Sequence, residues 1–168
     1  YKRQVVVYQL TTPLGILHTT FLFGIYAFGI MLALFIAGPL SDSFGRRAVM
    51  RPAVLTTTAG SLILLLGFHG AFLPLLIGRL CIGAAVGMAM SSGAAWIKEL
   101  STHVHIGAKR SSVALSSGFA LAPGIAGLAA QYLPWPTVLP YLFHIALALV
   151  VVPLVWMVPE PVSYTHLR

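Results

Sequence analysis

Few side chains in this sequence can do acid–base or metal chemistry. Its 168 residues include three carboxylates, Asp42, Glu99 and Glu160. It has one cysteine, Cys81, and the segment His103–His105 stands alone in a predicted loop. An active site needs a nucleophile with a neighbouring base, or clustered acids and histidines that hold a metal. We therefore expect no enzymatic activity, no cofactor and no metal site.

The sharpest local signal is the segment GPLSDSFGRR, which begins at Gly38 and reads as a helix end, a tight turn and a helix start. Asp42 can pair with Arg46 or Arg47, or can lie at the positive end of a neighbouring helix. Gly38 permits close helix contact, and Gly45 permits a turn with positive φ. The alternative interpretation is a loop whose arginines mark one side of a membrane and do nothing more.

Arg79 stands apart because it lies inside an apolar run. A buried cation at that depth is expensive, so it is paired or faces a watery cavity. The alternative is a structural hydrogen bond to backbone near the outer face. His69 and His144 lie near predicted helix ends, where a histidine meets the membrane interface. The aromatic residues expected in the interfacial belt are Tyr132, Trp135, Tyr141 and Trp156.

The composition places these residues in a membrane. Apolar residues make up 58% of the sequence and charged residues 8%, with a mean hydropathy of +0.93. Soluble domains carry about 25% charged residues, so this chain cannot cover a surface that faces water. Disorder and a disulfide-rich module are excluded as well. The net charge of +7 falls in short clusters between apolar runs, so we expect no nucleic-acid partner.

Five apolar runs are long enough to span a bilayer, which takes about 20 residues. The sequence therefore predicts an all-α membrane protein, a bundle of five transmembrane helices with short connections. The predicted helices are residues 14–40, 52–68, 73–97, 112–132 and 137–158.

Lysine and arginine cluster in alternate connections, which predicts the orientation. The connections after the second and fourth predicted helices carry no lysine or arginine. Lys2 and Arg3 fall on the side of the membrane opposite the main basic clusters and count against this orientation. We expect a multi-pass protein of the plasma membrane, in bacteria the inner membrane, surrounded by lipid and with its basic loops in the cytoplasm. The residues of these loops are Arg46, Arg47 and Arg51 after the first helix, and Lys98, Lys109 and Arg110 after the third.

Small residues recur at spacing four in the third and fourth predicted helices, which lets helices approach closely in lipid. Plain bundle packing explains such faces, and a face that slides during a conformational cycle is the alternative. Pro123 is expected to kink or soften its helix. Leu64 is expected to face lipid. The small residues are Gly83, Gly87, Ser91 and Ala95 in the third helix, and Gly118, Ala122, Ala126 and nearby Gly124 and Gly127 in the fourth.

Several motifs together resemble the major facilitator superfamily. The segment from Gly38 to Arg47 is similar to the family's loop signature between its second and third helices, except that Ser43 replaces a basic residue. Arg79 followed by Gly83 and Gly87 resembles the fourth-helix pattern. Glu99 lies where many members keep an acid. The segment Gly118–Gly127 is similar to the fifth-helix signature of drug–proton antiporters, except that Ala122 and Ala126 replace glycines. The segment Pro159-Glu160-Pro161 is similar to an element that follows helix six.

The resemblance implies that the five helices match family helices two to six. Residues 1–161 would then form most of the N-terminal half of a twelve-helix fold. The end Val162–Arg168 (VSYTHLR) resembles an adapter-derived sequence, and we expect it to be non-native. Transport requires helix one and the C-terminal half, so we expect that the chain by itself does not transport.

As a function, the resemblance implies a secondary active transporter that moves a small solute by alternating access. The loop would be a cytoplasmic gate, in which Asp42, Arg46 and Arg47 exchange charge pairs with Glu99 and Arg110. On the matching cavity-lining helix, Arg79 would contact a substrate anion or take part in proton coupling. The fifth-helix signature favours proton-coupled efflux; an uptake symporter of the same superfamily and a membrane module without transport are the alternatives.

Overall fold

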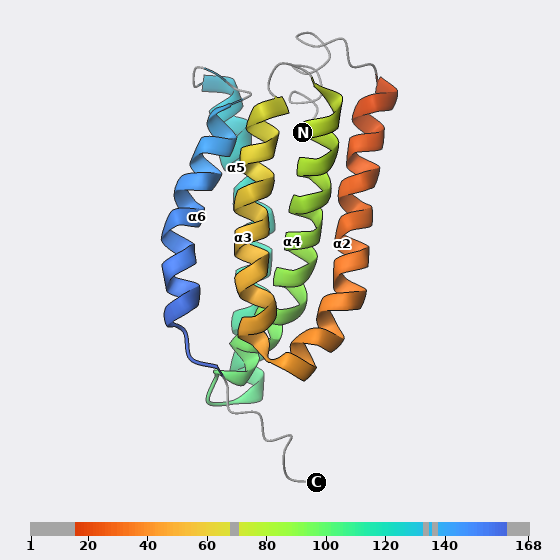
Figure 1. Ribbon diagram of the computed structural model, residues 1–168. Helices are drawn as coiled ribbons and strands as arrows, with labels where there is room; N and C mark the ends of the chain where they lie inside the picture. Colours follow the sequence, from red (N-terminus) through yellow and green to blue (C-terminus); the bar gives the residue numbers. More distant parts are fainter. Residues whose placement is uncertain (1–15, 68–70, 133–134, 136–137, 161–168) are drawn as a thin grey trace.

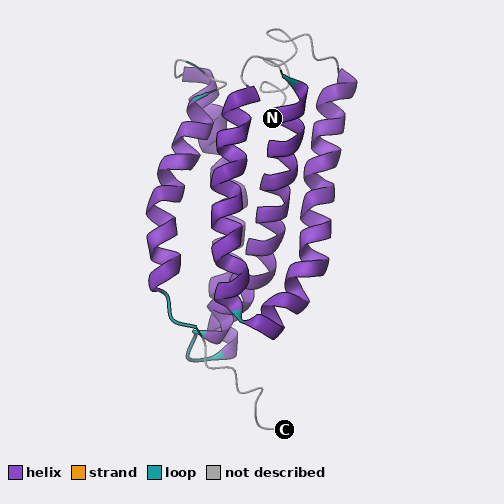
Figure 2. Ribbon diagram, viewed as in Figure 1, coloured by secondary structure: helices purple, strands orange, loops and turns teal. Residues whose placement is uncertain are grey.

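The computed structural model describes residues 16–67, 71–132, 135 and 138–160. All regular structure in these residues is helical, and no strand occurs among them (Figure 1, Figure 2). Each of the five helices is long and apolar enough to cross a membrane, which confirms the predicted all-α membrane bundle. The helices are α2 (Ile16–Phe44), α3 (Arg46–Leu66), α4 (Phe72–Glu99), α5 (Val104–Tyr132) and α6 (Leu139–Met157).

Helix α4 is the centre of the bundle. It packs most extensively against α2 and α3, and α3 in turn carries α6 on its other side. Figure 1 shows α6, α3, α4 and α2 side by side, with α5 behind them. Helix α5 packs against α4 and makes few contacts with α6. Anything that joins α3 and α4 therefore holds most of the bundle together.

Helices α2 and α4 approach so closely that their backbones touch at glycines. A Cβ atom on Gly87 would lie 2.5 Å from the carbonyl oxygen of Ile30, and one on Gly83 would overlap the carbonyl oxygen of Tyr26. From the other side, a Cβ on Gly29 would lie 2.9 Å from the Leu80 carbonyl oxygen. The structure thus places Gly83 and Gly87 against α2, at the spacing of four that puts small residues on one helix face.

The expectation that Leu64 faces lipid is wrong. Its side chain is 1% exposed and forms a cluster with Leu22 and Leu75, from α2 and α4. The neighbouring leucines of α3 that do face outward are Leu62 and Leu66, which are 50% and 73% exposed. Residues 62–66 of α3 (LILLL) are all apolar, so this run gives little indication of which leucine is buried, because lipid and protein interior are equally apolar.

The connection between the first two helices is much shorter than predicted. Residues 41–51 were expected to form a loop, but α2 continues to Phe44 and α3 begins at Arg46. Pro39 and Pro52 both lie within helices. Hydropathy marks only the part of a helix that lies in hydrocarbon, whereas the backbone hydrogen bonds of a helix continue past that boundary. The segment from Gly38 to Arg47 therefore consists of the end of α2, the junction at Gly45 and the start of α3.

Helix α5 also differs from the prediction, in extent and in packing. It begins at Val104 instead of residue 112, so that Lys109 and Arg110 belong to its first turns. It continues through Pro123, which is exposed. Positions Gly118 and Gly127 have no neighbouring atom within 4 Å of a would-be Cβ. The described residues therefore leave the small-residue face of α5 open, and the expected packing of Gly118, Pro123 and Gly127 is not made by them.

Adding a methyl group at Gly83 or Gly87 should destabilise the bundle, because it meets the rigid backbone of α2. Overpacking of this kind typically costs about 1–3 kcal/mol. We expect Gly83→Ala and Gly87→Ala to lower the midpoint of thermal unfolding, followed by circular dichroism in detergent micelles. Gly118→Ala is the matched control, since it adds the same group to open space and a better helix former. An equal loss of stability at all three positions would contradict the close α2–α4 contact.

Candidate functional site

The candidate site is built on the sharp junction between α2 and α3. Gly45 separates the two helices with φ 95° and ψ 161°. Its N–H donates to the carbonyl oxygen of Ser41 at 3.1 Å, which closes the last turn of α2. An L side chain is strained at this φ, so the turn needs glycine. The junction directs Arg46, the first residue of α3, back across the end of α2.

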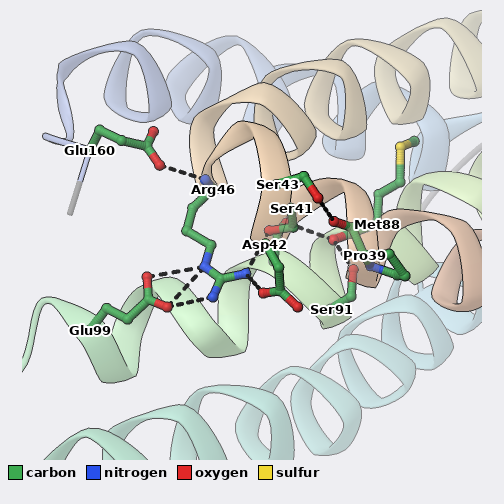
Figure 3. Close-up of polar contacts among 10 residues, drawn as sticks. Pro39, Ser41, Asp42, Ser43, Arg46, Met88, Ser91, Glu99 and Glu160 are labelled. Atoms are coloured by element: carbon green, nitrogen blue, oxygen red, sulfur yellow. Dashed lines mark hydrogen bonds and ion pairs between the residues drawn. The ribbon is translucent and has the colours of Figure 1, made fainter. Parts of the chain in front are cut away.

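Arg46 connects α2, α3 and α4 through its guanidinium group (Figure 3). One terminal nitrogen contacts Asp42 Oδ1 at 2.5 Å and Ser41 Oγ at 3.0 Å. The other terminal nitrogen contacts Glu99 Oε1 at 2.5 Å, and Nε lies 3.0 Å from both Glu99 oxygens. The arginine thus holds the end of α2 and the end of α4 at the same time.

The two carboxylates do not contribute equally to this network. The Arg46 side chain is 15% exposed, against 37% for Glu99 and 69% for Asp42. A bidentate contact between a guanidinium group and a carboxylate is stronger than a contact through one hydrogen bond. Water also weakens an ion pair that is exposed. Glu99 is therefore the principal partner of Arg46. Asp42 adds a weaker contact that can exchange with water.

The third carboxylate, Glu160, reaches the same point from the end of α6. Its Oε1 accepts a hydrogen bond from the backbone N–H of Arg46 at 2.5 Å, and its Oε2 accepts one from the N–H of Arg47 at 2.9 Å. These N–H groups belong to the first turn of α3, where a helix lacks internal acceptors and carries partial positive charge. Glu160 therefore caps α3, although 114 residues separate it from Arg46.

Gly45 and Glu160 fit together closely. A Cβ on Gly45 would lie 2.7 Å from Glu160 Oε1. The glycine is therefore required twice, once by its positive φ and once by the carboxylate that occupies the space beside it. Sequence reasoning missed the capping role of Glu160. The available signal was local: Gly45 has no side chain that could cap α3, and the first turn of α3 contains no acidic residue.

Two further hydrogen bonds attach the segment after α6 to the bundle. Arg47 Nε donates to the carbonyl oxygen of Val158 at 2.7 Å. Trp96 Nε1, from α4, donates to the carbonyl oxygen of Pro159 at 3.1 Å. Together with Glu160, these contacts fix residues 158–160 against α3 and α4. The expected pairing of Arg47 with Asp42 is not formed, because Arg47 points to α6 instead.

The remaining predicted charges lie outside this network. Arg110 is exposed and makes no ion pair with any described residue. Gly38 has open space around it instead of a close helix contact. Arg79 lies with its Cζ 5.9 Å from the ring centroid of Phe23, on α2. No hydrogen bond or ion pair joins the Arg79 guanidinium to another described residue.

The predicted interfacial residues have varied surroundings. His144 is not simply at the interface, since its Nδ1 is hydrogen-bonded at 2.8 Å to Oγ of Ser61, a buried residue of α3. Tyr141 packs against the core cluster around Leu64, whereas Trp135 is 71% exposed. His69 lies outside the described residues.

The chemistry available to this site is the making and breaking of charge pairs. Within the described part of the chain, no group of three or more His, Cys, Asp or Glu side chains could hold a metal ion. The network connects several helix ends. The Arg46 guanidinium binds carboxylates from α2 and α4, and the first turn of α3 binds the carboxylate that follows α6. A change in these pairs would change how those helix ends lie relative to one another.

Two comparisons of the chain with known proteins give matches. The family model of the Major Facilitator Superfamily matches residues 5–167. Over 92 residues the chain is 33% identical to the human protein called solute carrier family 2, facilitated glucose transporter member 10. That match covers 55% of this chain and 17% of the human protein. No solved structure matches the chain significantly.

Neutralising the two carboxylate partners of Arg46 should have unequal effects on stability. We expect Glu99→Gln to lower the free energy of unfolding by more than about 1 kcal/mol, because hydrogen bonds to charged groups contribute the most. Asp42→Asn should cost less than about 1 kcal/mol, as is usual for an exposed pair. Chemical denaturation of the two variants in mixed micelles measures the difference. A larger loss for Asp42→Asn would show that the exposed pair dominates.

The Gly45 junction should tolerate no side chain. Gly45→Ala places a methyl group in a positive-φ region that is essentially restricted to glycine, which costs about 1–3 kcal/mol, and pushes it against Glu160. Thermal unfolding should show a clear loss of stability, whereas Gly38→Ala, which meets open space, should show none. In a Glu160→Ala background the steric part of the loss should disappear while the part due to φ remains. If Gly45→Ala is as stable as Gly38→Ala, the described junction is wrong.

Proposed function

Since the chain belongs to the Major Facilitator Superfamily, we propose that it forms part of a secondary transporter that moves a small solute by alternating access. In such transporters, two halves rock about a central substrate site. Helix one and a second half would complete the substrate path. We assign the transporter to the plasma membrane, in bacteria the inner membrane, with the arginine end in the cytoplasm by the positive-inside rule.

The observation that carries this proposal is the convergence of carboxylates from α2, α4 and the segment after α6 on the first turn of α3. These contacts lie at one end of the bundle, where the carboxylate of Asp42 is largely exposed. Exposed ion pairs contribute little to stability, so water can replace them at small cost. We therefore assign Asp42, Glu99 and Arg46 to a gate whose pairs form in one state and break in another.

For the substrate, we favour a small polar solute such as a sugar, taken up without an ion gradient. The support is the sequence similarity to a protein whose name is facilitated glucose transporter. The described helices also carry their carboxylates only at their ends, at Asp42 and Glu99. No described carboxylate lies deep in a span, where proton coupling would require one. In this proposal, Arg79 of α4 contacts the solute.

Proton-coupled efflux is the second candidate. It is favoured by the similarity of residues 118–127 to the fifth-helix signature of drug–proton antiporters, although Ala122 and Ala126 replace two of its glycines. If coupling occurs, its carboxylate lies outside the described helices.

The two candidates differ in their response to a proton gradient. The test uses the protein expressed from the complete reading frame that contains these residues, reconstituted in vesicles. Facilitated uptake predicts saturable entry of radiolabelled glucose that equilibrates and is unchanged when the pH gradient is removed. Efflux predicts no glucose entry and extrusion of a lipophilic cation that stops without the gradient. If neither solute moves, the proposed substrates are wrong.

The gate assignment predicts that Asp42→Asn impairs transport more than it impairs insertion. Loss of a pair that contributes up to about 1 kcal/mol in one state shifts the balance between states by up to about fivefold. We expect the initial rate to fall several-fold, within that limit, while the amount of protein in the membrane stays the same. Lys109→Gln, which removes an exposed charge on α5, is the control and should transport normally. Parent-like rates for Asp42→Asn would remove Asp42 from the gate.

A further inference from the structure

A second cationic centre lies on α3, one turn beyond the gate. Arg51 lies over the ring of Trp156 on α6, with its Cζ 5.1 Å from the ring centroid. Its Nε is buried and has no hydrogen-bond partner among the described residues. A buried donor without an acceptor is costly, more so when it carries charge. The described residues leave this donor without an acceptor, and an anion would supply one and would also offset the charge of the guanidinium.

No carboxylate side chain of this sequence is left for this role. The sequence contains three acidic residues. Asp42 and Glu99 both contact Arg46, and Glu160 caps the first turn of α3. Arg51 therefore has no acidic partner among these residues.

Arg47 adds a second cation to the same face. It lies four residues before Arg51, so their side chains are neighbours on α3. Both reach α6, Arg47 through the Val158 carbonyl oxygen and Arg51 through the Trp156 ring. Like charges at this spacing repel each other. An anion between them would relieve that repulsion and accept hydrogen bonds from both guanidinium groups.

The depth of the pair fits a lipid headgroup. Arg51 lies five residues into α3, about 7.5 Å along the helix, and Trp156 is one residue from the end of α6. Tryptophan is enriched where headgroups meet hydrocarbon. One turn deeper along the same face of α3, Leu55 is 51% exposed. A phosphate at the arginines would therefore place its acyl chains beside this exposed leucine.

We propose that Arg47 and Arg51, with Trp156, bind the phosphate of an anionic phospholipid at the surface where α3 meets the end of α6. The arginines donate hydrogen bonds to the phosphate oxygens, and the indole ring holds the Arg51 guanidinium at headgroup depth. The site is separate from the gate carboxylates and does not depend on what the protein transports. Because Arg47 also holds the segment after α6, bound lipid would stabilise that attachment.

The test measures lipid preference directly on the purified chain. The chain in neutral detergent is mixed with equal amounts of phosphatidylglycerol and phosphatidylcholine of identical acyl chains, and native mass spectrometry counts the lipids retained. The parent should retain phosphatidylglycerol preferentially. Arg51→Gln should lower this preference about fivefold, the effect expected of one cation at an anionic surface. Lys109→Gln removes the same charge from α5 and should leave the preference unchanged, and Arg51→Lys should retain most of it.

Three outcomes would overturn the proposal. Equal effects of Arg51→Gln and Lys109→Gln would indicate general electrostatic attraction. An unchanged preference in Arg51→Gln would exclude the arginine. Displacement of phosphatidylglycerol by millimolar inorganic phosphate would assign the site to a soluble anion.

A second measurement avoids changing the charge, in case Arg51→Gln fails to fold. In the otherwise unaltered chain, brominated phosphatidylglycerol should quench Trp156 fluorescence, taken as the difference from Trp156→Phe, more strongly than brominated phosphatidylcholine. Equal quenching by the two lipids would contradict a headgroup site beside Trp156.

Discussion

The first turn of α3 receives all three acidic side chains of the protein. Asp42 and Glu99 contact the Arg46 guanidinium, and Glu160 accepts the backbone N–H groups of Arg46 and Arg47. The chain has ten lysines and arginines but only three acids, so this concentration leaves no carboxylate side chain for any other cation. The ends of α2, α4 and α6 are all positioned through this one turn. It is available for the purpose because Gly45 lets the chain reverse without a side chain in the way.

The membrane-spanning part of the bundle is held by a different kind of contact. Helices α2 and α4 touch through glycine and backbone atoms, and Leu64 joins α3 to its neighbours in a small apolar cluster. Such contacts depend on shape and cannot be exchanged for water. The ion pairs at the end of the bundle that carries Arg46 can be replaced by contacts with water. The described bundle therefore combines fixed packing in its membrane-spanning part with contacts at one end that water can replace.

The shortage of acids also explains why cations elsewhere have other surroundings. Arg79 lies against the ring of Phe23, and Arg51 lies against Trp156. An aromatic face attracts a guanidinium without requiring a counter-charge from the chain. It satisfies none of the guanidinium N–H groups, however. Each of these arginines therefore retains hydrogen-bonding capacity that no acidic side chain of this sequence takes up.

The sequence by itself determined the features that depend on local pattern. Hydropathy gave the five spans, the spacing of Gly83 and Gly87 gave one small-residue face, and the short distance from Asp42 to Arg46 gave an ion pair. Only the tertiary structure decided that Glu160 caps α3, that Arg47 turns to α6, and that Leu64 is buried. The capping contact joins residues more than a hundred positions apart, and no local pattern encodes it. In a run of consecutive apolar residues such as LILLL at 62–66, burial depends on which neighbouring helices pack against it, and composition does not show that.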